Sequence, residues 1–600
     1  MNELNEILNW LVLAYKFADD GDLKGMRACA REIFDADQTA ADGPAVMALA
    51  ALIAGDDVQA DLLSEDALAI DATNFNARLA RAGALSVQFV LDEEIAILKK
   101  LIKDATAANE REHATECELA GRLHLGHAMP EEEKKLREAT KAKRKILQSI
   151  LLRANGLLAD AAYLAADPAT SADALLATSG IAVNQEQKAD LYGKYLFMLN
   201  YRVGKSDEKV SEQAKKYDAF WAHIAPMDHS GVRKIADKKL RIGYISGDFR
   251  LNSVAYFLEP LFKDFDRENF IVHCYSRGKA DEVTNNLRRM PVLWRDVRGK
   301  SAATVANTIA ADHVDILVDL AGHSQNSNMA IMAYHSAPIQ MTALGYTATT
   351  GLKAQDYFLS DKVCVPVPSS AKGFTEKVAA MSCCCFCYAP GTVRQMPPAA
   401  TRALVTDNGY VTFGCFNNFN KVTDDLLHLW RSVLDRIEDS RLIIKGKVCS
   451  VPSGRKMLME RLQKLSFDTS RIELRPYSQN YLEEYRDIDI ALDTMPYNGG
   501  LTTCETLFMG VPVVTAAGRT HGSRIGASIL TNADLKELVA QNQMEYVKKI
   551  IQIASNPSLI KRYHSGLREH VRNSSLMDTK NYMKELERIY RQMWMEFCRS

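Results

Sequence analysis

Residues 487–515 read DIDIALDTMPYNGGLTTCETLFMGVPVVT. Apolar runs at both ends are typical of buried parallel strands. Between them lie a turn made by Asn498, Gly499 and Gly500 and a helix expected to begin near Thr502. Glycines let the backbone approach a ligand, and a helix start offers unpaired N–H groups to an anion. The stretch predicts a strand, turn, helix and strand with a phosphate site, although a plain turn capped by Thr503 or Thr502 fits equally well on these residues alone.

The length and the net charge limit the number of domains and the kinds of ligand to expect. The chain has 600 residues, which at roughly 150 residues per domain gives about three to four units. Lys and Arg total 74 and Asp and Glu total 75, so no overall field draws the protein to nucleic acid or to an anionic membrane. An anionic ligand must therefore be held by local groups.

The amino-terminal segment predicts a helix rather than a signal peptide. Residues 1–20 contain an apolar run without a basic segment before it or a small-residue cleavage site after it. The sequence contains no run of about eighteen apolar residues, the length that would predict a membrane-spanning helix. The 12 cysteines are expected to be reduced and buried, as in a cytoplasmic enzyme.

Four cysteines lie close together at Cys383, Cys384, Cys385 and Cys387. Structural zinc sites use separated ligand pairs, whereas these residues are nearly adjacent. The spacing favours a strand that presents the cysteines on alternating faces, so we expect no metal site there.

The first part of the chain predicts helices only. Residues 1–120 are rich in Ala and Leu at helical spacing, and Asp35 and Asp71 lie in similar contexts, close to the ~34-residue period of tetratricopeptide repeats. Such arrays bind a protein or peptide. Residues 121–235 predict a helical connector.

The second part predicts an α/β fold. From residue 236 apolar strand-like runs alternate with helical segments, and a proline-rich break lies near 395–400. We expect two Rossmann-like domains, 236–395 and 396–600, with ligands at the carboxyl ends of their strands. A last helix, 579–598, should dock across one domain.

Four segments carry a family resemblance, at 243–262, 313–351, 413–425 and 491–515. In order and spacing they resemble the catalytic region of the O-linked N-acetylglucosamine transferase and SPINDLY-like family, nucleotide-sugar enzymes that modify proteins. The resemblance implies the glycosyltransferase B fold, with the acceptor on the first Rossmann-like domain and the donor on the second. Bacterial protein N-glucosyltransferases are the nearest group that could be confused with it.

The resemblance implies roles for donor-binding residues. Lys421 matches the lysine on the donor pyrophosphate, with Asn418 beside it; a fixed ammonium stabilises a leaving diphosphate without a metal. Thr502 and Thr503 match the threonines at the phosphates, and Glu505 matches the acidic residue on the ribose hydroxyls. Without the resemblance, each has an ordinary structural interpretation.

Further candidates line the two sides of the expected cleft. Tyr481 lies near the position where relatives hold a histidine against the base, where an aromatic ring can stack. Gly345 is implied beside the sugar, because glycine permits close backbone approach. His323 ends a predicted strand and is expected to point into the cleft. Gly499 and Gly500 complete the predicted donor site.

One position departs from the family pattern. Many relatives have a histidine where this chain has Asn252, and that histidine is proposed to act as a base or to position the acceptor. An amide cannot take a proton, so a base must come from Asp248, His323, water or the donor phosphate. The catalytic candidates are therefore Lys421, Asp248, Asn252 and His323.

These observations predict an inverting, metal-independent transfer of N-acetylglucosamine from its uridine diphosphate to Ser or Thr of a client protein, with flagellin as one candidate. No cofactor is expected, and neither nucleic acid nor a membrane is an expected partner. The helical region would bind the client protein. Formation of a homo-oligomer is an open alternative. The alternatives are glucosylation of Asn, fucosylation from a guanosine donor, and a binding protein with a weakened catalytic half. A nucleotide-sugar epimerase is a distant further candidate.

Overall fold

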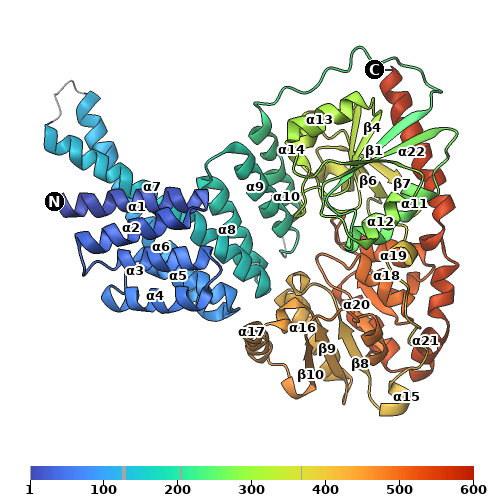
Figure 1. Cartoon of the computed structure of the whole chain (residues 1–600). Helices are drawn as coiled ribbons and strands as arrows, with labels where there is room; N and C mark the ends of the chain where they lie inside the picture. Colours follow the sequence, from blue (N-terminus) through green and yellow to red (C-terminus); the bar gives the residue numbers. More distant parts are fainter. Residues whose placement is uncertain (1, 125–129, 203–205, 367, 600) are drawn as a thin grey trace. The chain divides into compact units, whose positions relative to one another are not determined.

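The computed structural model describes residues 2–124, 130–202, 206–366 and 368–599. Its contacts divide the chain into two compact units, Met1–Leu191 with Val451–Leu458, and Tyr192–Ser450 with Met459–Ser600. Figure 1 colours the chain along its sequence. Each unit has its own interior, so each is described by itself.

The first unit is built from helices. Their bounds are α1 Asn2–Asp20, α2 Leu23–Ala36, α3 Asp42–Ile53, α4 Asp57–Ile70, α5 Phe75–Val87, α6 Leu91–His124, α7 Glu131–Leu164 and α8 Pro168–Ile181, with α9 Gln185–Leu199 leading into the second unit. Side chains of Asp22, Asp56 and Asn74 accept N–H groups at helix starts. Ala48 and Ala80 are fully buried, which lets neighbouring helices pack closely.

A loop that repeats between helix pairs gives the period of the array. The carboxylate of Asp37 accepts the N–H and the hydroxyl of Thr39, and Asp71 does the same with Thr73. These two turns follow α2 and α4 and lie 34 residues apart in sequence. The predicted match of Asp35 with Asp71 is off by two residues: the structural equivalent of Asp71 is Asp37, because Asp37 and Asp71 make the same turn.

The second unit contains two parallel sheets (Figure 1). The first has the order β3-β2-β1-β4-β5-β6-β7 and the second β10-β9-β8-β11-β12-β13. The first-sheet strands are β1 Leu240–Ser246, β2 Phe270–Ser276, β3 Leu293–Asp296, β4 Ile316–Asp319, β5 Ile339–Thr342, β6 Tyr357–Asp361 and β7 Lys377–Met381. The second-sheet strands are β8 Thr412–Cys415, β9 Arg441–Lys445, β10 Ile472–Arg475, β11 Ile490–Leu492, β12 Val513–Ala516 and β13 Val539–Ala540. The predicted α/β class with two Rossmann-like domains is confirmed.

Helices connect the strands, as parallel pairing requires. The helices are α10 Ser206–Ala214, α11 Glu259–Lys263, α12 Glu282–Arg288, α13 Ala302–Ala311, α14 Met329–Met332, α15 Val405–Asn408, α16 Asp424–Arg436, α17 Pro452–Lys464, α18 Leu501–Phe508, α19 Ile525–Asn532, α20 Gln543–Ala554, α21 Pro557–Arg572 and α22 Thr579–Arg599. The predicted crossover is confirmed as β11, α18 and β12, with Ala491 paired to Val513.

The strand order fixes where a ligand can bind. In the second sheet β8 and β11 are neighbours; the connection after β8 leads to β9 on one side, and the connection after β11 leads to β12 on the other, so the two run in opposite directions. Loops at such a switch point diverge and leave a crevice at the carboxyl ends of the strands. The segments that follow β8 and β11, residues 416–421 and 493–500, therefore meet at this crevice.

Two features of the carboxyl-terminal half can be compared with the sequence predictions, and the docking of the last helix on one domain is as expected. The last helix, α22, packs against β5, β7 and α11 of the first sheet's domain, and the hydroxyls of Tyr590 and Tyr244 lie 3.0 Å apart. The predicted strand through the cysteine run is wrong: β7 ends at Met381, and residues 383–387 follow it as buried irregular chain. Among the described residues, no helix is long and apolar enough to span a membrane.

A buried hydrogen-bond chain ties two helices to the end of β11. Trp430 Nε1 on α16 donates to the Tyr546 hydroxyl on α20 (3.1 Å), and that hydroxyl donates to the Asp493 carbonyl (3.0 Å). Trp430 and Tyr546 are both fully buried. If the Tyr546 hydroxyl is removed, the Trp430 N–H and the Asp493 carbonyl are too deeply buried to bond to water instead.

Tyr546→Phe should destabilise the second sheet's domain. The substitution leaves the Trp430 N–H and the Asp493 carbonyl buried without this partner, at a cost of about 1–3 kcal/mol. A lower melting temperature by calorimetry is the expected result. Tyr477→Phe, at a side chain that is 56% exposed, is the control and should leave the melting temperature unchanged; equal effects of the two changes would contradict the assignment.

Candidate functional site

The segment after β8 brings Lys421 to the switch point. Asn418 caps a short 3-10 turn, Phe419–Lys421, by accepting the N–H of Asn420 at 3.2 Å. The Lys421 ammonium donates to the Asn498 carbonyl at 2.8 Å and lies 4.2 Å from the centre of the Tyr497 ring. The loop after β8 and the glycine turn after β11 are therefore joined by a cation.

A buried carboxylate, Asp493, shapes the glycine turn. Its oxygens accept the Gly499 N–H at 2.7 Å and the Thr515 hydroxyl at 2.6 Å. The Thr503 hydroxyl donates to the Gly499 carbonyl at 2.9 Å. Burial raises the pKa of Asp493, and the hydrogen bonds and the charge of Lys421 oppose that shift. The sequence analysis did not select Asp493, although its place directly after a buried strand was a usable signal.

The two glycines of the turn differ in what they require. A Cβ at Gly499 would lie 2.6 Å from Thr503 Oγ1, so the turn has no room for a side chain there. A Cβ at Gly500 would meet only Ile525, at 3.8 Å. Gly500 is the N-cap of α18, which begins at Leu501, and the first N–H groups of a helix have no partner within it. The helix start therefore offers donors and the positive end of its dipole.

A cavity of about 280 Å³ lies beside this helix start. Its lining consists of Leu251, Asn252, Ser253, Tyr256, Arg394, Phe416, Lys445, Gly446, Tyr477, Tyr481, Tyr485, Leu501, Thr502 and Glu505. Four predicted site residues, Asn252, Tyr481, Thr502 and Glu505, meet in it. Five aromatic rings with two cations and one carboxylate suit a flat base attached to a sugar and an anionic group. The aromatic residues other than Tyr481, and both cations, were missed because they come from separate segments.

Tyr481 and Glu505 form a pair in this cavity. The Tyr481 hydroxyl donates to Glu505 Oε1 at 2.5 Å. Arg394 lies 5.5 Å from the centre of the Tyr481 ring, and Tyr477 stacks on that ring at 6.4 Å. Burial raises the pKa of Glu505 to about 7, against the hydrogen bond from Tyr481. Glu505 is placed as a hydroxyl acceptor, and Tyr481 is placed both to orient it and to present an aromatic face.

Asp248 and Asn252, the two candidates that follow β1, are close in sequence but only Asn252 lines the cavity. Asp248 follows β1, is 4% exposed and accepts the Asn326 amide at 2.6 Å. Burial raises the pKa of Asp248, but the residue does not line the cavity. Asn252 does line it, and its side-chain oxygen accepts the Val254 N–H at 2.6 Å to start the turn Ser253–Phe257. Asn252 thus combines a capping bond with a position facing the cavity.

His323 and Gly345 are placed elsewhere. His323 was expected to point into the cleft; it is 1% exposed, and its ring packs 4.4 Å from the Tyr217 ring centre and 5.2 Å from that of Tyr346. Its Nε2 donates to the Thr350 carbonyl at 2.7 Å. A Cβ at Gly345 would lie 2.1 Å from the Leu320 carbonyl oxygen. Close backbone packing therefore accounts for this glycine without a sugar.

A second cavity of about 570 Å³ has Tyr497 among its lining residues. Residues from both sheets line it, including Thr347, Thr349, Pro496 and His521. Tyr497 lines this cavity while its ring lies over Lys421. Tyr497 therefore connects Lys421 to this cavity.

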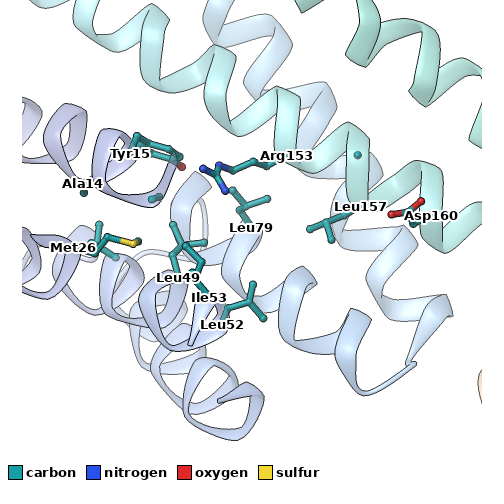
Figure 2. Close-up of a pocket in the computed structure, with 13 residues that line it drawn as sticks. Ala14, Tyr15, Met26, Leu49, Leu52, Ile53, Leu79, Arg153, Leu157 and Asp160 are labelled. Carbon is teal, nitrogen blue, oxygen red and sulfur yellow. The ribbon is translucent and has the colours of Figure 1, made fainter. Parts of the chain in front are cut away.

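The helical unit contains a separate apolar cavity of about 310 Å³ (Figure 2). Its lining consists of Ala14, Tyr15, Ala18, Met26, Val46, Leu49, Leu52, Ile53, Leu79, Arg153, Gly156, Leu157 and Asp160. Gly156 stands inside the long helix α7, where glycine costs about 1 kcal/mol relative to alanine. A Cβ there would meet no atom within 4 Å. No packing contact demands this glycine; its effect is to widen the cavity.

Comparison with known families identifies which residues of the chain match a family of enzymes. The model of glycosyl transferase family 41 matches residues 219–409 and 392–586. Among curated relatives, the probable UDP-N-acetylglucosamine–peptide N-acetylglucosaminyltransferase SPINDLY of Solanum lycopersicum is 36% identical over 412 residues, covering 67% of this chain and 44% of the relative. The corresponding SEC protein of Arabidopsis thaliana is 26% identical over 413 residues, covering 64% of this chain and 41% of the relative. The chain thus spans less than half the length of these relatives.

A solved structure shares the whole fold. A mutant of the O-GlcNAc transferase of Thermobaculum terrenum superposes with a TM-score of 0.68 and 24% identity, covering 100% of this chain and 99% of that one. At this identity the match shows that the fold is shared. It covers the helical part as well as both sheets.

Diphosphate binding should depend on the protonation of Lys421. Burial lowers the pKa of this ammonium to about 8, and an anion binds the protonated form. Affinity for uridine diphosphate should therefore begin to fall about one pH unit below the pKa of Lys421 and approach a tenfold loss per pH unit well above it. Calorimetric titration from pH 6.5 to 9.5 measures this.

Lys421→Ala is the matched control for that titration. It should bind the diphosphate more weakly and show no fall between pH 8 and 9.5, because the titrating charge is gone. An identical pH profile in the variant would contradict the assignment of Lys421 to the diphosphate.

Proposed function

The chain belongs to glycosyl transferase family 41 and is therefore a glycosyltransferase, and we propose that it transfers N-acetylglucosamine from uridine diphosphate N-acetylglucosamine to Ser or Thr hydroxyls of a client protein. The observation that carries the proposal is the junction of Lys421, the Gly499 turn and the start of α18 beside an aromatic cavity. The names of the SPINDLY and SEC relatives support the donor and the protein acceptor. We place the reaction in the cytoplasm.

The cavity supplies complementary groups for each part of the donor. The base would lie among the tyrosines, with Tyr481 at its face, and the ribose hydroxyls would donate to Glu505 in place of the Tyr481 hydroxyl. The diphosphate would lie between the α18 start, with the Thr502 hydroxyl, and the Lys421 ammonium. These groups provide the positive potential that a metal ion would otherwise provide, which is why the proposed transfer is metal-independent.

The proposed step is a single in-line displacement. The acceptor oxygen forms a bond to the anomeric carbon as the bond from that carbon to the phosphate oxygen breaks, and the electron pair leaves with uridine diphosphate. Developing charge on the phosphate is met by Lys421 and the helix start. The hydroxyl proton must pass to the donor phosphate or to water, because Asn252 cannot accept it, Asp248 does not line the cavity and His323 is buried in the interior.

A donor panel tests the reaction. The chain is incubated with client extracts and with the N-acetylglucosamine, glucose or fucose nucleotide, and glycopeptides are sequenced by mass spectrometry; flagellin is the first purified client to try. N-acetylglucosamine on Ser or Thr is expected, with Lys421→Ala at least about 100-fold slower. An Asn-linked hexose, or binding of the donor without any transfer, would overturn the proposal in favour of an N-glucosyltransferase or a binding protein.

We further propose that the apolar cavity of the helical unit receives an apolar side chain of the client. Its lining is almost wholly apolar, with Arg153 and Asp160 as the charged groups at its edge (Figure 2). Arg153 also pairs with Asp19 at 2.6 Å. Such a setting suits a Leu or Phe side chain whose flanking backbone or polar neighbours meet the charges.

Gly156→Phe should block this cavity. A phenyl ring built into open space fills the room for a client side chain, so KM for the intact client should rise about tenfold or more, while transfer to a short peptide stays unchanged. Gly156→Ala is the control: it adds one methyl, should raise helix stability by about 1 kcal/mol, and should leave KM nearly unchanged. Equal KM values for the Phe variant and the unmodified chain would refute the docking site.

A further inference from the structure

Three metal-ligating side chains meet in the interior of the second unit. One ligand atom from each of Cys364, Cys385 and His521 lies within 4.8 Å of the others. The residues are 1%, 3% and 5% exposed, respectively. They come from the segments that follow β6, β7 and β12, so neither sequence spacing nor the run of cysteines indicates the cluster.

The chemistry of the cluster matches one class of ion. Two thiolates and an imidazole are the ligand types that zinc takes in proteins, at about 2.3 Å to sulfur and about 2.0 Å to nitrogen. Tetrahedral ligands at those lengths lie about 3.4–3.8 Å from each other. Side chains already within 4.8 Å need only small rotations to reach that geometry.

A buried carboxylate supports both cysteine-bearing segments. Asp361 at the end of β6 accepts the Cys364 N–H at 2.8 Å through one oxygen, and the Cys385 N–H at 3.0 Å through the other. The second oxygen also accepts the Ser528 hydroxyl at 2.8 Å. Metal ligands are commonly fixed by such outer hydrogen bonds, and here one group holds two ligands in place.

The imidazole of His521 is held by packing more than by hydrogen bonds. Phe358 and Phe374 meet its ring edge-on, with centres 5.2 Å and 6.3 Å away. Neither ring nitrogen has a hydrogen bond of ordinary geometry, and the polar groups that act on the ring are the Asp361 carboxylate and the Thr347 backbone. An interior imidazole with so little hydrogen bonding is explained if one nitrogen is a ligand.

We propose that Cys364, Cys385 and His521 bind one zinc ion, with a water as the fourth ligand. The two thiols lose their protons to solvent as the ion binds, so two thiolates balance its charge beside a neutral imidazole. His521 lines the 570 Å³ cavity, which gives the ion and its water a way in. The ion would tie the segments after β6 and β7 of the first sheet to the loop after β12 of the second, and its effect on stability is what the test below measures.

Zinc binding is tested on the full chain. The protein is purified under reducing conditions, dialysed with one equivalent of Zn²⁺ and then against zinc-free buffer, and its metal content and melting temperature are measured. About one zinc per chain and a higher melting temperature than the chelator-treated protein are expected. His521→Phe keeps an aromatic ring of similar size and should weaken zinc affinity at least about tenfold, and Cys364→Ser should do the same.

Cys274→Ser is the matched control, since Cys274 is fully buried in β2 and outside the cluster; it should keep one zinc. Cobalt substitution adds an independent readout, because a thiolate-to-cobalt absorption band should appear in the unmodified chain and be about half as strong per bound cobalt in Cys364→Ser, which keeps one thiolate. Fewer than a tenth of an equivalent of zinc in the unmodified chain, equal zinc in His521→Phe, or a Cys364–Cys385 disulfide in the reduced preparation would each overturn the proposal.

Discussion

The hydrogen bonds accepted by the buried Asp493 carboxylate are the constraint on which the proposed donor site depends. They connect the end of β11 to the Gly499 turn and to Thr515 on β12, while the Asp493 carbonyl is bound to the buried Tyr546 and Trp430 pair. Burying a carboxylate costs free energy unless donors surround it. The turn conformation that supplies those donors is also the one that places the Asn498 carbonyl against Lys421.

The same device recurs at other strand ends. Asp319 at the end of β4 accepts the N–H groups of Ala321 and Gly322, and burial raises its pKa to about 6. Asp361 at the end of β6 holds the two cysteine segments in the same way. In parallel sheets the loops at the carboxyl ends build the sites, and here buried aspartates fix the loops that do so.

The electrostatics of the donor site are arranged by this framework. Lys421 is half-buried beside Asp493, so its charge is partly balanced before any anion arrives, and its pKa of about 8 leaves it protonated at neutral pH. Glu505 lies further along α18 with the Tyr481 hydroxyl on it. A donor would exchange that hydroxyl for a ribose hydroxyl and bring its diphosphate to the lysine, so binding satisfies groups that are already oriented. The helical unit adds a separate apolar cavity, kept wide by Gly156, as the proposed contact with a client.

The sequence by itself determined the fold class, the crossover at 487–515, the helical amino-terminal part and the resemblance that led to Lys421, Thr502 and Glu505. These features follow from local patterns, because apolar runs, glycine turns and helix starts can each be recognised in a short continuous stretch of residues. Three predictions from the sequence did not match the structure: the pairing of Asp35 with Asp71, a strand through Cys383–Cys387, and a His323 side chain in the cleft. Each depends on how distant segments pack. Only the tertiary structure decided which aromatic rings line the cavity, that Asp493 holds the turn, and that Cys364, Cys385 and His521 meet. Such groups come from separate loops, and the register and strand order that bring them together are set by burial of the whole sheet rather than by any one segment.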